Sequence, residues 1–189
     1  MILNTPAADA IIDEVRHWVD RAVIGLNLCP FAKAVQVKGQ IRYAVSDATD
    51  AEGVLPDLEA ELQRLADTAP EELDTTLLIL PEALHDFYDF NDFEELSERL
   101  LKQMNLVGEL QVATFHPLFQ FAGTEPEDIE NYTNRSPYPI LHLLREDSID
   151  RAVEAFPDAA EIYEKNIETL RELGHDGWQG LMEDGRGVS

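Results

Sequence analysis

Polar side chains that could do chemistry are concentrated in residues 116–136, which begin at His116 and end in the sequence NYTNRS. His116 follows a short apolar run and precedes a proline, a position from which an imidazole can act as a general acid or base. Arg135 carries a guanidinium suited to carboxylate or phosphate groups, and the amides of Asn131 and Asn134 could orient a substrate. The structural alternative is that these side chains hold the loop itself, because Asn and Ser near proline favour turns.

Cys29 is the single cysteine, and its thiol is the second candidate for catalysis. It follows a predicted helix, whose dipole opposes ionisation of the thiol, although Lys33 could offset that effect. Free cysteine is also a common packing residue, so both roles stay open. A single cysteine cannot form an internal disulfide, which is typical of a reducing compartment. We therefore expect a cytoplasmic protein.

Two segments of this acidic chain, residues 21–46 and 131–145, contain no carboxylate. The chain average of 38 acids in 189 residues predicts about eight in these 41 positions. Buried elements exclude charge, which explains part of the gap, but every charged residue that does occur there is basic. We therefore predict a local electropositive pocket in which Arg135 binds an anionic group, with Lys33 or Arg42 adding positive potential.

Motifs for metals and cofactors are weak or missing. His116 and His142 could join Asp89 or Glu130 as metal ligands, but no HxH or HExxH spacing supports this, so we predict no metal site. His142 lies in an alternating apolar segment and is better interpreted as a core histidine. Glycine-rich phosphate loops, nucleotide fingerprints and the GxSxG nucleophile elbow are absent, which leaves any cofactor unknown.

Hydrophobic periodicity predicts the elements that would position these residues. Apolar residues at helical spacing predict helices over residues 11–26, 54–65 and 93–104. Short β-prone runs predict strands over residues 40–45, 75–80, 110–115 and 140–146. Two further helices are expected over residues 148–156, with Ser148 as N-cap, and 158–173, with Gly174 as the stop signal.

This order predicts an α/β (or α+β) fold with a small sheet of three or four strands, mixed or parallel, flanked by amphipathic helices. Residues 1–178 are expected to form a single domain, and residues 179–189 a disordered tail. Right-handed crossovers would make the first three strands parallel, and ligands in such sheets bind beyond the strands' carboxyl ends. A ferredoxin-like antiparallel sheet is the main alternative.

The net charge of −24 and the isoelectric point near 4.3 argue against several partners. A field of this sign repels nucleic-acid phosphates and anionic membrane surfaces. The longest apolar runs are also far shorter than the ~20 residues that a membrane span requires. We expect neither nucleic acid nor membrane as a partner, and the oligomeric state stays open.

Several longer motifs carry a family resemblance. They are GLNLCPFAK, LPEALHDFYDFNDF, NIETLRELG and the segment from VATFHPLF through NYTNRSPYPILHLLRE. Together they resemble a bacterial family of proteins of unknown function, domain of unknown function fourteen-fifteen, over nearly the whole chain. The resemblance implies no activity and no cofactor, so the function must be argued from the residues.

The residues lead to two hypotheses about function. The first is a small-molecule enzyme, a hydrolase or transferase acting on a phosphorylated or carboxylated substrate, with His116 as general acid or base and Cys29 as reserve nucleophile. The alternative is a non-enzymatic module that recognises an anionic metabolite or a basic protein partner through its acidic surface. Whether the protein is an enzyme stays open at this point.

Overall fold

The β-prone runs form one mixed sheet in the computed structural model, which describes residues 1–155 and 161–183. The strands are β1 (Ile41–Val45), β2 (Thr75–Ile79), β3 (Leu110–Phe115) and β4 (Ile140–Arg145). Their order in the sheet is β1-β2-β4-β3. β1 pairs in parallel with β2, whereas β4 pairs antiparallel with both β2 and β3. The first three strands therefore share one direction, as predicted, and β4 runs the opposite way between two of them.

The position of β4 explains the long irregular segment before it. The chain leaves β3 at Phe115 and returns through residues 116–139, which contain a 3-10 helix, η2 (Ile129–Asn134). Ile140 at the start of β4 then pairs with Ile79 and Phe115, the last residues of β2 and β3. The carboxyl ends of three strands and the loop 116–139 thus meet at one edge of the sheet.

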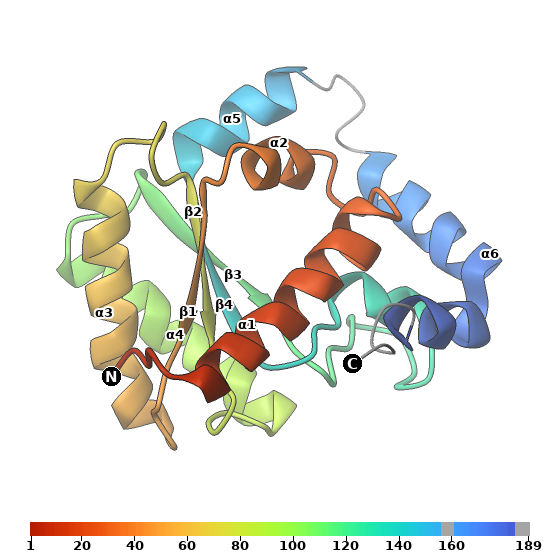
Figure 1. The fold of residues 1–189 in the computed structure, drawn as a ribbon, viewed down its shortest axis with the longest axis horizontal. Helices are drawn as coiled ribbons and strands as arrows, with labels where there is room; N and C mark the ends of the chain where they lie inside the picture. The colour runs from red at the N-terminus through yellow and green to blue at the C-terminus, as the bar shows by residue number, and fades with distance from the viewer. Residues whose placement is uncertain (156–160, 184–189) are drawn as a thin grey trace.

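Helices cover both faces of the sheet (Figure 1). One face carries α3 (Ala51–Asp67) and α4 (Phe87–Gln103). The other carries α1 (Pro6–Trp18) with its π-helical continuation η1 (Val19–Ile24), then α2 (Ala32–Val37), α5 (Glu146–Ala155) and α6 (Ile162–Glu183). Both faces of β2 are covered, and all five of its residues are buried. The predicted α/β class with a small mixed sheet is confirmed.

Alternate side chains of the strands supply two separate cores. On the α3 and α4 side, the sheet residues Ala44, Leu78, Leu141 and Leu143 pack with Leu58, Leu62, Phe90 and Phe93. On the other side, Val45, Leu77, Ile79 and Ile140 pack with Trp18, Val19, Ala22 and Leu170. Side chains at positions 140, 142 and 144 of β4 therefore point toward the face that α1, η1 and α2 cover.

The last two helices differ in detail from the expectation. α5 begins at Glu146, and Ser148 lies within its first turn, where its hydroxyl donates to Asp74 (2.6 Å) instead of capping the helix. Gly174 does interrupt α6, with a φ of 67°, but a second helical segment follows it. Residues 179–183 of the predicted tail belong to this segment. Residues 156–160 and 184–189, which include Pro157 and the rest of the tail, lie outside the described residues.

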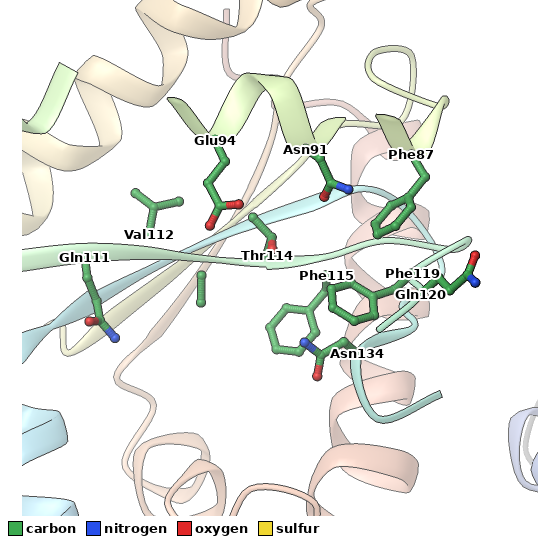
Figure 2. Close-up of a pocket in the computed structure, with 11 residues that line it drawn as sticks. Phe87, Asn91, Glu94, Gln111, Val112, Thr114, Phe115, Phe119, Gln120 and Asn134 are labelled. Carbon is green, nitrogen blue, oxygen red and sulfur yellow. The ribbon is translucent and has the colours of Figure 1, made fainter. Parts of the chain in front are cut away.

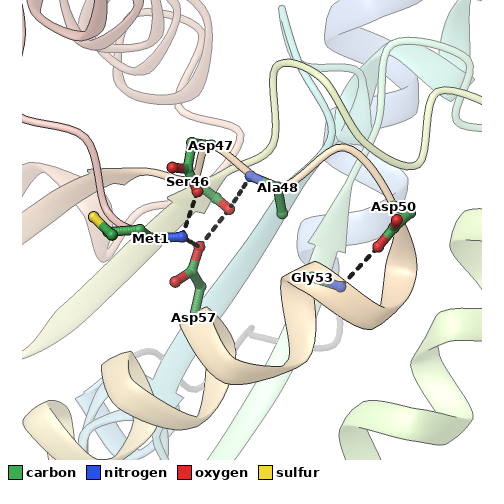
Figure 3. A network of polar contacts seen from close by, with 7 residues as sticks. All are labelled: Met1, Ser46, Asp47, Ala48, Asp50, Gly53 and Asp57. Atoms are coloured by element: carbon green, nitrogen blue, oxygen red, sulfur yellow. Dashed lines mark hydrogen bonds and ion pairs between the residues drawn. The ribbon is translucent and has the colours of Figure 1, made fainter.

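The carboxyl end of β1 is closed by a polar network (Figure 3). Ser46, directly after β1, donates to Asp57 on α3 (2.6 Å), and its hydroxyl accepts from the backbone N–H of Ala48 (3.0 Å). The amino group of Met1 donates to both Asp47 and Asp57, and these hydrogen bonds raise its pKa. Asp50 caps α3 by accepting from the N–H of Gly53 (2.8 Å). Met1, Ser46, Asp47 and Asp57 are therefore bound to one another at this end of the sheet.

Candidate functional site

His116 anchors the start of the long loop. Its side chain is buried, and its Nδ1 accepts a hydrogen bond from the backbone N–H of Leu118 (3.0 Å). Its Nε2 must then carry the proton, which it donates to the carbonyl of Leu84 (3.0 Å). The rings of Phe87 and Phe90 pack against it, and burial lowers its pKa, so the imidazole is neutral at pH 7. Both ring nitrogens are engaged by backbone groups.

Asn131 and Arg135 hold the same loop together through hydrogen bonds to its backbone. The Asn131 amide is fully buried: its oxygen accepts from the N–H of Phe121 (3.0 Å), and its nitrogen donates to the carbonyl of Glu125 (2.8 Å). Arg135 donates to the carbonyls of Phe119 (3.2 Å) and Pro126 (2.6 Å). This geometry matches the structural alternative raised by the sequence, in which the polar side chains hold the loop.

The remaining predicted substrate-binding residues lie on three different elements, β1, α2 and η2. Arg42 lies on β1, at the opposite edge of the sheet from β3, where it forms a two-pronged ion pair with buried Glu61 (2.6 and 3.0 Å). Lys33 is exposed on α2. Asn134 lines a groove beside β3. The predicted anion pocket, with these groups around one ligand, stays a prediction.

A cavity of about 350 Å³ lies between the sheet and the helices η1, α2 and α5. Its lining is mostly aliphatic and aromatic. The sheet contributes Ile41, Thr75, Leu77, Gln111, Ala113, Phe115, His142 and Leu144, and the covering elements contribute Trp18, Val19, Val23, Cys29, Phe31, Ala32, Val35, Ile149 and Ala152. Asp74 and Ser148, which bond to each other, complete the lining. Such a volume falls in the range of roughly 300–1,000 Å³ typical of small-molecule sites.

His142 is the notable polar group of this cavity. It lies at the middle of β4, paired with Leu77 on one side and Ala113 on the other, and it points to the cavity side of the sheet. Its ring packs beside Phe115, with 5.7 Å between the centroids. No group among residues 1–155 and 161–183 forms a hydrogen bond to its nitrogens. Burial lowers the pKa of His142 to about 4, so at pH 7 it offers one donor and one acceptor.

Three other polar side chains of the cavity, those of Asp74, Thr75 and Ser148, already have partners. The hydroxyl of Thr75 donates to the carbonyl of Leu143 (2.6 Å). Cys29 is half-buried and borders the cavity, so the sequence-based candidate thiol and His142, which the sequence favoured as a core histidine, line the same space. The only signal for His142 in the sequence was a polar residue at an inward-facing position of an apolar strand, which is also the pattern of an ordinary core histidine.

The part of the chain that the structure describes contains no group of three or more His, Cys, Asp or Glu side chains placed to hold a metal ion. None of its helices combines the length and the apolar character needed to cross a membrane.

Comparison with known proteins gives a family and no activity. No curated protein matches the chain, and no solved structure matches it. A family model described as "Protein of unknown function (DUF1415)" matches residues 10–180, which confirms the resemblance suggested by the motifs. The matched range includes every strand and the cavity-lining residues from Trp18 to Ala152. The chain therefore belongs to the DUF1415 family of proteins of unknown function.

Proposed function

We propose that this protein binds a small, largely apolar molecule in the cavity beneath α2 and α5, with one polar group of the ligand facing His142. The observation that carries the proposal is an imidazole without a hydrogen-bond partner among the described residues, set in an apolar cavity. The His142 side chain is half-buried and faces the cavity. A ligand with a matching donor or acceptor would gain a hydrogen bond worth roughly 1 kcal/mol and bury the apolar lining at the same time.

The lining favours a neutral ligand. Among the described residues, no Lys or Arg side chain lines the cavity, and Asp74 lies at its margin. A neutral imidazole does not compensate the charge of a buried carboxylate or phosphate, whose desolvation is expensive. A hydroxyl, carbonyl or amide group on the ligand would suit His142 better. The phosphorylated or carboxylated substrate expected from the sequence stays a prediction, and so does a hydrolase or transferase reaction.

Trp18 provides a direct reporter of occupancy. It lines the cavity, whereas Trp178, the second tryptophan of the chain, does not. In a Trp178→Phe background, the fluorescence of Trp18 can be followed during titration with phenol, toluene and benzoate. Phenol and toluene have nearly the same shape and differ in one hydroxyl, and benzoate adds a charge. We expect saturable binding of phenol and toluene, and weaker binding of benzoate.

Comparison with His142→Leu isolates the polar contact. Phenol and toluene differ in their cost of leaving water, but that difference cancels when the same two probes are compared on both proteins. One hydrogen bond is worth about 1 kcal/mol, so the ratio of phenol to toluene affinity should fall about fivefold in the variant. An unchanged ratio would remove His142 from the site. Tighter binding of benzoate than of phenol would favour the anionic ligand instead.

Cys29 gives a second, independent readout. As the single cysteine, it reacts alone with iodoacetamide, and its rate of alkylation can be followed by mass spectrometry. A ligand in the cavity should slow that reaction, because the half-buried thiol borders the same space. The absence of both protection of Cys29 and a saturable change at Trp18, across all three probes, would refute the proposal.

A further inference from the structure

β3 is an edge strand whose free side is open in its middle. The backbone N–H of Glu146 donates to the carbonyl of Glu109 (3.0 Å), which sets the alternation of the ladder between β4 and β3. In that alternation, the residues at 111, 113 and 115 face β4, and the N–H and C=O groups of Val112 and Thr114 point away from the sheet. The hydrogen bond from the backbone N–H of Leu80 to the carbonyl of Pro139 (3.0 Å), where β2 meets the start of β4, is consistent with the same alternation.

The chain covers both ends of this free side but not its centre. At one end the N–H of Leu110 donates to the carbonyl of Leu106 (2.9 Å), and at the other the N–H of His116 donates to the carbonyl of Asn134 (3.2 Å). Within the described residues, no backbone or side-chain group bonds to the outward groups of Val112 and Thr114. Unpaired edge groups of this kind are a template for another strand.

A groove runs along this edge between β3 and α4, which we call the β3 groove. One part, of about 500 Å³, reaches from Glu94 to Asn134 (Figure 2), and a second, of about 400 Å³, reaches from Glu94 to Glu146. The two parts share Glu94, Gln111 and Val112, so they are continuous. Figure 2 shows Glu94 and Asn91 projecting from α4 over the strand. The groove therefore follows the whole length of β3.

The charge of the β3 groove selects its occupant. Glu94, Glu98 and Glu146 line it, and the single cation of its lining, Lys102, is within 3.8 Å of Glu98. Pairing of β3 with β3 of a second copy would bring these carboxylates together on two chains that each carry a net charge of −24. Like charges across a strand pair are destabilising. An extended segment with basic side chains would instead meet opposite charge.

We propose that the β3 groove binds an extended, lysine- or arginine-bearing segment of a partner protein, which adds to β3 as a fifth strand. The backbone of the segment would bond to the outward N–H and C=O groups of Val112 and Thr114, which supply affinity without sequence preference. Its basic side chains on the α4 side would face Glu94 and Glu98, which supply selectivity. This site lies on the edge of the sheet and does not depend on the ligand proposed for the cavity.

The test uses a capped heptapeptide that alternates lysine and valine, with its binding followed by fluorescence anisotropy of an attached dye. The control peptide has the same sequence with N-methyl groups on the backbone of alternate residues, so it keeps the charge but cannot add as a strand. We expect the N-methylated peptide to bind at least tenfold more weakly. On the protein, Glu94→Gln with Glu98→Gln should weaken binding of the parent peptide about fivefold and reduce its salt dependence.

Hydrogen exchange locates the contact. Bound peptide should slow exchange of the Val112 and Thr114 amides at least tenfold, which a purely electrostatic association would not do. Thr114→Pro removes one outward N–H and leaves the ladder to β4 intact, so this variant should fold and lose binding. Equal binding of the N-methylated peptide, or unchanged exchange at these two amides, would overturn the proposal. Dimerisation of the free protein that Thr114→Pro abolishes would also overturn it, because the occupant would then be a second copy.

Discussion

Replacing His142 with Leu should make the stability of the protein less sensitive to acid. In the folded chain burial holds the pKa of His142 at about 4, whereas the same imidazole has a pKa near 6.5 when it is exposed by unfolding. Between these values the unfolded chain binds a proton that the folded chain does not. The free energy of unfolding therefore decreases as the pH falls from 6.5 toward 4, and it is unaffected by this group above pH 7.

The size of the effect follows from the two pKa values. Each pKa unit corresponds to 1.36 kcal/mol, and at pH 4 the folded site is half protonated, so the wild type loses about 3 kcal/mol at this position between pH 7 and pH 4. The Leu side chain does not titrate and is similar in volume. Relative to the wild type, the variant should gain about 3 kcal/mol over the same interval.

Urea denaturation at several pH values from 4 to 7 measures this difference directly. Carboxylates elsewhere titrate in both proteins and cancel in the comparison. His175→Gln is a matched control, since His175 is an exposed histidine that does not line the cavity. If the free-energy difference between wild type and His142→Leu were the same at pH 4 and pH 7, the lowered pKa of this imidazole in the folded chain would be refuted.

Three further substitutions test contacts of the basic and polar residues. Arg42→Met should destabilise the protein by about 3 kcal/mol in urea denaturation, because it leaves the buried Glu61 carboxylate without its two-pronged partner. Adding Glu61→Leu should restore most of that loss, and a double variant as unstable as the single one would contradict this explanation. Asn131→Leu should cost about 3 kcal/mol, since it removes the fully buried amide that binds the loop, and limited proteolysis should then cleave within residues 117–130. Arg145→Met should cost about 2–3 kcal/mol, because the backbone carbonyls that Arg145 binds would lose a charged donor. The thermal midpoint should then fall by about 5–10 °C, and no shift would show that water replaces the guanidinium.

The layered fold was predictable because its signals are local. The β-prone run over residues 75–80 predicted a strand, and β2 (Thr75–Ile79) forms there with every residue buried. The insertion of β4 between β2 and β3 carried no local signal, since it depends on which distant edges find each other after the loop 116–139 is placed. Short-range periodicity gives the elements, whereas their pairing is decided by long-range packing.

The candidate site shows the same division. Residue type identified Asn131 and Arg135 as unusual, but the path of the loop determines whether their donors face a ligand or the chain's own carbonyls. The cavity was not predictable, because it arises where α2 and α5 cover the sheet without filling the space beneath them. A strand pattern alone could not distinguish a histidine packed in a core from His142, which borders that space.

The central position of β4 also has a consequence for how the chain is made. β3 ends at Phe115, but the strand that pairs with it ends at Arg145, 30 residues later. At a synthesis rate of roughly 5–20 residues per second, β3 waits a few seconds on the ribosome for its partner. During that interval both edges of β3 are unpaired, and so is the edge of β2 that later pairs with β4. Unpaired strand edges are prone to intermolecular pairing. A chaperone that holds the chain until β4 has emerged would therefore reduce aggregation during synthesis, most of all where synthesis is slow.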